Sequence, residues 1–209
     1  PREKMDVLYI GNDFNEFSPQ PKTERSALFH VGFYGALNPL QGVLNILEAA
    51  FLLRDHTDIV FEIIGTGFEY KKALAYIEEK QLKNVRTPGW LSPRDLAHAL
   101  NQFDLALGIF GETSKADLVI PNKIYHYAGC GLPILTKSTP AIRELFKDGE
   151  TIALTSCAPS EIAKEILNLK NSPERLKTLG KNTHAFLFEN FNQRAVAANL
   201  IEIYGHSQK

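Results

Sequence analysis

From residue 29 onward, short apolar runs typical of strands alternate with longer amphipathic runs typical of helices. Phe29 to Tyr34 is a mainly apolar run of the kind found in buried parallel strands, and a helical pattern from about Leu40 to Arg54 follows it. Elements of this length in alternation form a parallel sheet that is covered by helices on both faces and joined by right-handed crossovers. The sequence therefore predicts an α/β fold, with a Rossmann-like parallel sheet and a helical C-terminal tail.

Turn residues and helix-start signals set the expected limits of the other elements. Ser92 followed by Pro93 is an N-cap with proline in the first turn, which predicts a helix from there to Gln102. We expect further strands at 59–64, 84–87, 103–110, 132–136 and 151–155. We expect further helices at about 68–80, 140–146, 160–168, 173–188 and 193–204, and a short one beginning at Pro121.

Composition argues against several classes of function. The 209 residues are 44% hydrophobic and 22% charged, which suits one α/β domain. A formal net charge of -1 without a basic cluster argues against nucleic-acid partners and charged membrane surfaces. No apolar run approaches the roughly 18 residues of a membrane span. Cys130 and Cys157 are too few for a disulfide framework and lack metal-ligand spacing, so we expect a cytoplasmic protein without a bound metal.

The stretch from Pro121 to Thr136 has the pattern of a phosphate site. A polar loop runs into a short helix, and a buried strand follows. With Pro121 in the first helical turn, the amides of Asn122, Lys123 and Ile124 would be free to face a ligand. An anion at a helix start meets these amides and the positive end of the helix dipole, which contributes about 0.3–2 kcal/mol. The side chain of Lys123 would add a full charge.

Glycine-bearing loops follow three of the expected strands. Gly35 follows the first strand, Gly65 and Gly67 follow the second, and Gly89 with Trp90 follows the third. Because the carboxyl ends of parallel strands meet at one edge of a sheet, these loops are expected to gather where such folds bind ligands. The glycines would let the backbone approach a ligand, although glycine after a strand is also an ordinary turn former. Trp90 would line a base pocket or serve as a half-buried packing residue.

Four blocks of the sequence carry a resemblance to a known family. They are Val31 to Gly42, Ile63 to Gly67, Thr87 to Leu91, and Pro121 to Tyr127 with Gly131 to Ile134. In order and spacing they resemble the donor-binding domain of the retaining glycosyltransferases of family 4 (glycosyl transferases group 1), which are two-domain GT-B enzymes. The resemblance implies that residues 29–209 are the C-terminal, nucleotide-sugar-binding domain. Residues 1–28 would be the last strand and the linker from a missing N-terminal domain.

The resemblance also implies which side chains meet the donor phosphates. The family usually places an Arg and a Lys in the loop after the first strand, and those positions are Ala36 and Gln41 here. Charge-assisted hydrogen bonds contribute about 1.5–3 kcal/mol each, so the loss of both cations would weaken binding unless another cation substitutes. Lys123 is the first candidate and Lys115 the second. The alternative is that Lys123 is a solvated lysine at a helix start.

Two glutamates of the family, spaced as E-x7-E, fall on Leu118 and His126. The second glutamate normally holds the ribose hydroxyls, which His126 could do with one ring nitrogen accepting and the other donating. The first normally contacts the donor sugar, and Asp117 or Glu112 would have to replace it. The alternatives are that His126 packs beneath Tyr127 and that the two acids are solvated loop residues.

The residues and the resemblance together give two sets of candidates. The candidate catalytic residues are Lys123, Asp117 and Glu112. The candidate donor-binding residues are Gly35, Asn38, Gly65, Gly67, Gly89, Trp90, Asn122, Lys123, Ile124 and His126. We expect no cofactor, because the substrate would be a nucleotide-diphosphate sugar, with a UDP-sugar as first choice and a GDP-sugar as second.

The function that the resemblance implies is transfer of a sugar to a saccharide or lipid-linked acceptor, in the synthesis of cell-surface polysaccharide or lipopolysaccharide. The acceptor, and any peripheral contact with a membrane, would belong to the missing domain, so this piece alone is expected to be inactive. Three alternatives remain: a non-catalytic binding or scaffolding subunit, a GT-B sugar-nucleotide epimerase and, last, a nicotinamide dehydrogenase. The segment from Gly65 to Gly67 lacks the third glycine of the dinucleotide motif, which argues against the dehydrogenase.

Overall fold

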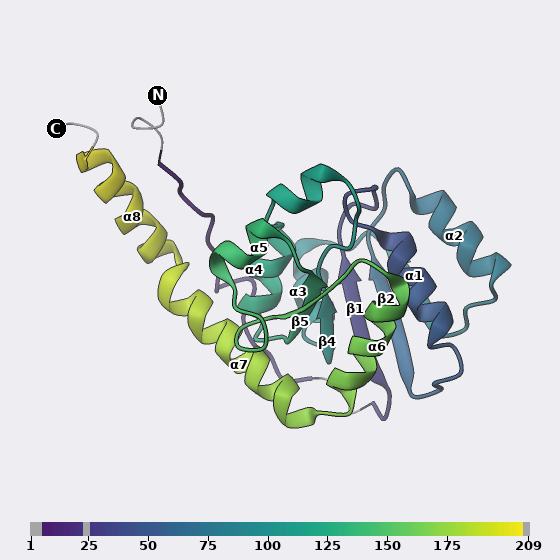
Figure 1. The fold of residues 1–209 in the computed structure, drawn as a ribbon. Helices are drawn as coiled ribbons and strands as arrows, with labels where there is room; N and C mark the ends of the chain where they lie inside the picture. The colour runs from purple at the N-terminus through teal and green to yellow at the C-terminus, as the bar shows by residue number, and fades with distance from the viewer. Residues whose placement is uncertain (1–5, 23–25, 207–209) are drawn as a thin grey trace.

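Six parallel strands form one sheet in the order β3-β2-β1-β4-β5-β6 (Figure 1). The structure is a computed structural model that describes residues 6–22 and 26–206. The strands are β1 Phe29–Tyr34, β2 Ile59–Ile64, β3 Val85–Gly89, β4 Leu105–Leu107, β5 Ile134–Lys137 and β6 Ala153–Thr155. The sheet confirms the Rossmann-like parallel fold that the alternating pattern predicts.

The strand order reverses between β1 and β4. From β1 the chain moves outward through β2 to β3, and it then returns to place β4 on the other side of β1. β1 pairs with β2 along its whole length, from Phe29 opposite Ile59 to Tyr34 opposite Ile64. Because consecutive crossovers leave in opposite directions at such a reversal, the loops beyond the carboxyl ends diverge and leave room for a ligand.

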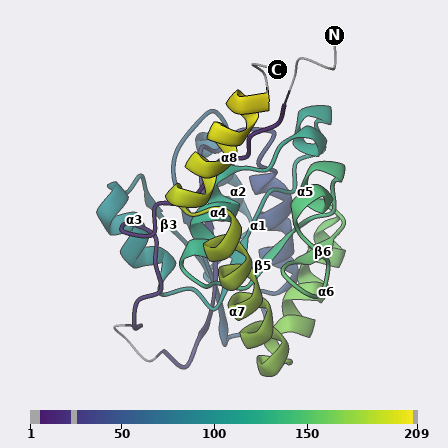
Figure 2. The same ribbon diagram turned by 90° about the vertical axis from the view of Figure 1, so that its left-hand side faces the viewer.

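Helices cover both faces of the sheet, as Figures 1 and 2 show from two directions. The helices are α1 Val43–Leu52, α2 Tyr70–Glu79, α3 Pro93–Leu100, α4 Asn122–Gly129, α5 Pro140–Leu145, α6 Pro159–Lys170, α7 Pro173–Asn190 and α8 Gln193–His206, with a 3-10 helix η2 at Ser114–Leu118. One buried cluster combines residues of α1, α2 and α6 with the sheet. A second combines residues of α3, α4, α5 and α7 with the sheet. The sheet is therefore buried on both sides, as its apolar strands require.

Of the element boundaries that differ from the expected ones, three lie next to the loops at the carboxyl edge. α1 begins at Val43 and not near Leu40, because Gly42 takes a left-handed conformation with φ of 68° at the N-cap. The strand expected at 103–110 pairs as β4 only over Leu105–Leu107. α4 begins at Asn122, and Pro121 is its extended N-cap rather than a residue of its first turn. The predicted N-cap at Ser92 is confirmed, since its side chain accepts a hydrogen bond from the amide of Asp95.

The N-terminal segment lies against the C-terminal helices. The amide of Asn12 donates to the carbonyl of Phe191 at 3.0 Å, and Asn12 forms a parallel bridge with Asn192. Phe17 is buried and stacks on the ring of His126 in α4. In both ribbon views α8 projects from the body of the domain beside this segment (Figures 1 and 2). Within the described part of the chain, no helix has the length and apolar character needed to cross a membrane.

Candidate functional site

A pocket of about 350 Å³ opens at the carboxyl ends of β1, β2 and β3. Its lining residues are Tyr34, Gly35, Ala36, Ile64, Gly65, Thr66, Trp90, Leu91 and Leu96. The structure thus brings together three of the candidate donor-binding residues, namely Gly35, Gly65 and Trp90. None of the side chains that line this pocket carries a charge. The pocket therefore suits an uncharged, partly apolar group such as a nucleobase.

The glycines in these loops are required by contacts between the loops. Gly65 has φ of 125°, and a Cβ atom there would lie 2.1 Å from the carbonyl oxygen of Gly35. Gly67 has φ of 150°, and a Cβ atom there would lie 2.7 Å from the carbonyl oxygen of Leu37. The amide of Leu37 also donates to the carbonyl of Thr66 at 2.9 Å. The two loops therefore form the rim of the pocket through backbone packing, which is the plainer of the two interpretations of these glycines.

Trp90 stands at the mouth of the pocket and is 69% exposed. Gly89, with φ of 81°, ends β3 directly before it, and the Gly89 carbonyl accepts a hydrogen bond from the amide of Gly65 at 2.7 Å. The turn at Gly89 thus fixes the neighbouring backbone while the indole ring stays largely in solvent. Trp90 is not the half-buried packing residue that one alternative expected.

Lys123 is buried, with only 3% of its surface exposed. Its ammonium group Nζ donates to Gln41 Oε1 at 2.5 Å and lies 3.6 Å from the centre of the Phe33 ring. A Cβ atom at Gly35 would lie 3.0 Å from the same nitrogen. Burial lowers the pKa of Lys123 well below its ordinary value. The alternative of a solvated lysine at a helix start is therefore wrong, and the amine lies beside Gly35 in the first glycine loop.

The start of α4 offers two free amides and not three. Ile124 is fully buried, and its amide donates to the carbonyl of Pro121 at 2.9 Å, so the expectation that it faces a ligand is wrong. The amides of Asn122 and Lys123 have no acceptor within the described chain, as is usual in a first helical turn. Asn122 is exposed, whereas Lys123 is buried.

His126 contacts the side chains of Tyr34 and Phe17. Its Nδ1 lies 2.5 Å from the hydroxyl of Tyr34, and its ring stacks on Phe17 with 3.9 Å between ring centres. Burial lowers the pKa of His126 to about 4, so the ring is neutral at pH 7. Because Nδ1 already has Tyr34 as its partner, the ribose role that requires both ring nitrogens does not fit this arrangement. The amide of Tyr34 donates to the hydroxyl of Tyr127 at 3.0 Å, which fixes the end of β1 against α4.

The two candidate acids lie outside the pocket. Asp117 forms an ion pair with Lys137 at 2.9 Å, so its carboxylate already has a counter-charge. Glu112 is exposed and borders a separate pocket of about 370 Å³ together with Asn45 and Glu69. Leu118 is 75% exposed and provides no polar group. The structure therefore does not bring a carboxylate of this loop to the pocket at β1, β2 and β3.

Three further side chains lie in or near the loop that follows β1. Asn38 is half-buried in the first glycine loop, and its Oδ1 has no hydrogen-bond partner within the described residues. Tyr34 lines the pocket and also binds His126, a role that sequence reasoning missed. Its position as the last residue of β1 was the available signal, since such residues reach the ligand-binding edge. Gln41, at a position where the resemblance implies a cation, accepts a hydrogen bond from the amine of Lys123.

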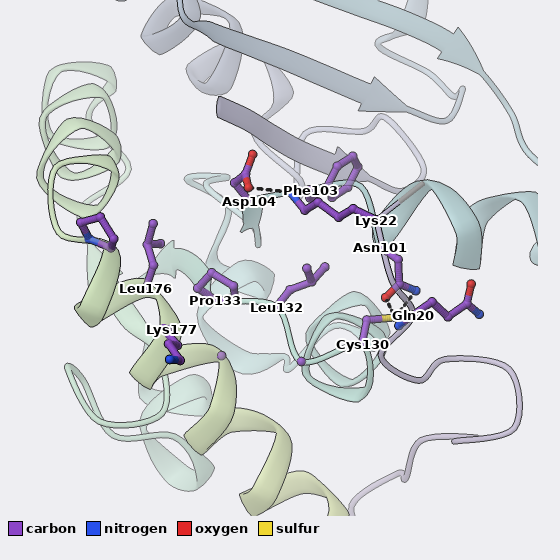
Figure 3. Close-up of a pocket in the computed structure, with 13 residues that line it drawn as sticks. Gln20, Lys22, Asn101, Phe103, Asp104, Cys130, Leu132, Pro133, Leu176 and Lys177 are labelled. Atoms are coloured by element: carbon purple, nitrogen blue, oxygen red, sulfur yellow. Dashed lines mark hydrogen bonds and ion pairs between the residues drawn. The ribbon is translucent and has the colours of Figure 1, made fainter. Parts of the chain in front are cut away.

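A second pocket, of about 380 Å³, lies at the opposite edge of the sheet (Figure 3). Asp104 and Pro133, which precede β4 and β5, line it together with Lys22 and Lys177. Lys22 forms an ion pair with Asp104 at 2.5 Å. Burial raises the pKa of the Cys130 thiol in this pocket to about 12, so it is not a reactive thiolate at pH 7. This pocket is away from the carboxyl edge and its glycine loops.

The sequence profile of the glycosyl transferase-like family matches residues 45–202, which is most of the chain. The chain belongs to this family, the group 1 glycosyltransferases. The match agrees with the GT-B donor-domain resemblance carried by the four sequence blocks. Ligands of such sheets bind at the carboxyl ends of the strands, which favours the pocket at β1, β2 and β3 over the pocket near Cys130 as the candidate site.

Relatives and solved structures agree with the family. Spore coat protein SA of Bacillus subtilis (strain 168) is 25% identical over 226 aligned residues, covering 97% of this chain and 59% of that protein. The structure of Anabaena Alr3699/HepE in complex with UDP and glucose has a TM-score of 0.82 at 20% identity, covering 96% of this chain and 56% of that chain. The C-terminal domain of the group 1 glycosyl transferase LpcC from Francisella tularensis has a TM-score of 0.72 at 14% identity, covering 88% and 100%. This chain thus spans less than two thirds of the first two proteins.

Proposed function

We propose that this chain is the donor-binding domain of a retaining glycosyltransferase that uses a nucleotide-diphosphate sugar. The observation that carries the proposal is the uncharged pocket at the carboxyl ends of β1, β2 and β3, which the two glycine loops and Trp90 enclose. The start of α4, with the free amides of Asn122 and Lys123, would face the diphosphate. Family membership supports sugar transfer as the reaction.

The lining of the pocket favours a uracil base over guanine. Guanine presents N–H donors on its pairing edge that are commonly matched by a carboxylate, and no acidic side chain lines this pocket. Uracil can be bound through main-chain groups such as those of Gly89 to Leu91, and Trp90 can cover its ring. The HepE structure, whose fold this chain shares, contains UDP and glucose. We therefore place a UDP-sugar first and a GDP-sugar second.

Acceptor binding would belong to a further domain. The chain spans 59% of the spore coat relative and 56% of the HepE chain, while it corresponds to the whole of the isolated LpcC C-terminal domain. The acceptor would be a saccharide or a lipid-linked saccharide used in cell-surface polysaccharide assembly. We expect the 209 residues alone to bind the donor and to transfer no sugar, because a GT-B site is completed by its other domain.

Titration with nucleotides tests the proposal directly. Trp90 is the chain's single tryptophan and stands at the pocket mouth, so its fluorescence reports on binding there. UDP should change the emission saturably, and GDP should bind at least about tenfold more weakly because its pairing edge is left unmatched. Ala36→Phe fills the pocket and should abolish the response, whereas Ala75→Phe on the exposed surface of α2 should leave it intact. Equal affinity for UDP and GDP would contradict the base assignment.

A non-catalytic binding subunit is a second candidate. It is favoured by the absence of a free carboxylate at the family positions, where Leu118 is exposed and apolar and His126 is bonded to Tyr34. Calorimetry with UDP-sugars and GDP-sugars distinguishes the two. Heat of binding with a UDP-sugar supports the transferase domain, and no heat with any nucleotide sugar supports a scaffold.

A further inference from the structure

The amine of Lys123 has more hydrogen-bonding capacity than its surroundings satisfy. A lysine ammonium has three N–H donors, and within the described chain Gln41 Oε1 is its one acceptor. No carboxylate among the described residues forms an ion pair with it. The rings of Phe33 and Tyr34, whose centres lie 3.6 Å and 5.9 Å from Nζ, provide further attraction to a cation.

Packing alone does not explain a lysine at this position. A buried ammonium without a counter-charge is costly, and an apolar side chain of similar length would fill the same space at lower cost. The amine is placed beside Gly35, whose missing side chain leaves room next to Nζ. Gly35 also lines the uncharged pocket, so a ligand there would bring its polar part toward this amine.

We propose that Lys123 is the cation that binds the diphosphate of the donor, and that Gln41 positions its amine from across the site. This inference rests on the proposed function and names the residues with which that same site would bind the negative charge of the donor. The loop that carries cations in the family has Ala36 and Gln41 at those positions. In this chain the charge instead comes from Lys123 in α4. Gln41, at one of these two positions, provides the acceptor that orients the amine.

A bound phosphate would provide acceptors for N–H donors that have none within the described chain. Phosphate oxygens would accept the two remaining N–H donors of Lys123 and the free amides of Asn122 and Lys123, which leave the same helix start. The charged form of the amine is disfavoured by burial in the empty site and becomes favoured when a phosphate lies against it. Lys123 is thus a binding residue for the leaving group, and Gln41 is a positioning residue.

Gln41→Glu is the most direct test. It keeps the shape of residue 41 and places a carboxylate beside Lys123, so the new ion pair should maintain or raise thermal stability. The same carboxylate should repel phosphate, and UDP affinity measured through Trp90 emission should fall at least tenfold. Uridine, which has no phosphate, should bind the variant and the parent equally.

Two further variants and a control complete the design. Lys123→Met should weaken UDP binding at least tenfold and leave uridine binding unchanged, and Lys72→Met on the exposed surface of α2 should change neither. The exchange variant Gln41→Lys with Lys123→Gln should recover most of the UDP affinity, since it returns one cation to the site. Circular dichroism checks that every variant is folded.

The outcomes separate this inference from the proposed function. If UDP and uridine bind the parent but Gln41→Glu leaves UDP affinity intact, the role of Lys123 is wrong and the donor site stands. If Lys123→Met weakens uridine and UDP equally, the lysine is structural and the inference fails. If the parent binds neither compound, the proposed function fails and this inference fails with it.

Discussion

His126 shows at the scale of one residue how contacts within the protein set its protonation. Between Phe17 and the hydroxyl of Tyr34, the folded ring has a pKa of about 4, compared with an ordinary value of 6.5. The unfolded chain therefore binds a proton that the folded chain rejects at pH values between these two. The stabilising contribution is complete above pH 6.5 and is lost as the pH falls toward 4.

We expect His126→Gln to make the domain less sensitive to mild acid. Between pH 7 and pH 5 the parent should lose about 1–2 kcal/mol of unfolding free energy through this ring, a value reduced for its partial exposure. The glutamine can still accept a hydrogen bond from Tyr34 but does not titrate. Urea unfolding at several pH values measures both slopes. Parallel pH profiles for the two proteins would contradict the assignment of a neutral His126.

Gly65 lies at the rim of the pocket, where close packing of two loops requires a glycine. Gly65→Ala would force a Cβ atom to within 2.1 Å of the Gly35 carbonyl oxygen at a φ of 125°, so we expect a loss of about 3 kcal/mol or more. Gly149→Ala is the matched control, because Gly149 also has a positive φ, 75°, but has no atom within 4 Å of an added Cβ. It should cost only about 1 kcal/mol, for backbone conformation alone. Thermal unfolding that shows equal losses would contradict loop packing as the reason for glycine.

At the scale of elements, α3 depends on its cap. Ser92 Oγ accepts a hydrogen bond from the amide of Asp95 at 3.3 Å. Leu96, in α3, is one of the residues that line the pocket. Ser92→Ala should cost about 1 kcal/mol and weaken UDP binding slightly, because the helix start moves more freely. Ser172→Ala before α7 is the control, since Ser172 occupies the same position but makes no capping hydrogen bond. Chemical unfolding compares the two variants. Equal losses of unfolding free energy would contradict a stabilising role for the cap of α3.

Elements were predictable where the local signals and the tertiary contacts agree. β1 lies at the predicted residues, because its apolar run is buried on both faces. The sequence pattern places the start of α1 too early, since the conformation of Gly42 depends on its close packing against the backbone of Phe110, far along the chain. The sequence pattern also places Pro121 in the first helical turn of α4. Sequence alone does not distinguish an N-cap proline from one at the next position.

The candidate site was predictable in its location but not in its side-chain contacts. Strand ends and glycines fix which loops meet at the carboxyl edge, and these follow from the alternation of elements. The pairing of Lys123 with Gln41, and of His126 with Tyr34, joins residues 82 and 92 positions apart in sequence. Such pairs depend on how α4 packs against β1, which no local pattern contains.

At the scale of the whole molecule, stability should decrease from the middle of the sheet toward the C-terminal helix. β1 lies between β2 and β4, and Val31 and Phe33 within it are fully buried. α8 projects from the body (Figures 1 and 2), and Ile201 and Tyr204 on it are 72% and 67% exposed. Amides exchange through local opening, whose cost is low where few apolar groups are buried.

Hydrogen exchange followed by mass spectrometry measures this gradient. We expect peptides from β1, β2 and β4 to exchange slowest, near the rate set by global unfolding, and peptides from α8 to exchange fastest among the helices. α7 is the internal control, because Leu179, Thr183 and Leu187 bury one face of that helix and should slow its exchange. Since α8 contributes little to the buried clusters, its opening should leave the exchange of β1 unchanged. Slow exchange in α8 equal to that in α7 would show that this helix is held by contacts as strong as those of the core.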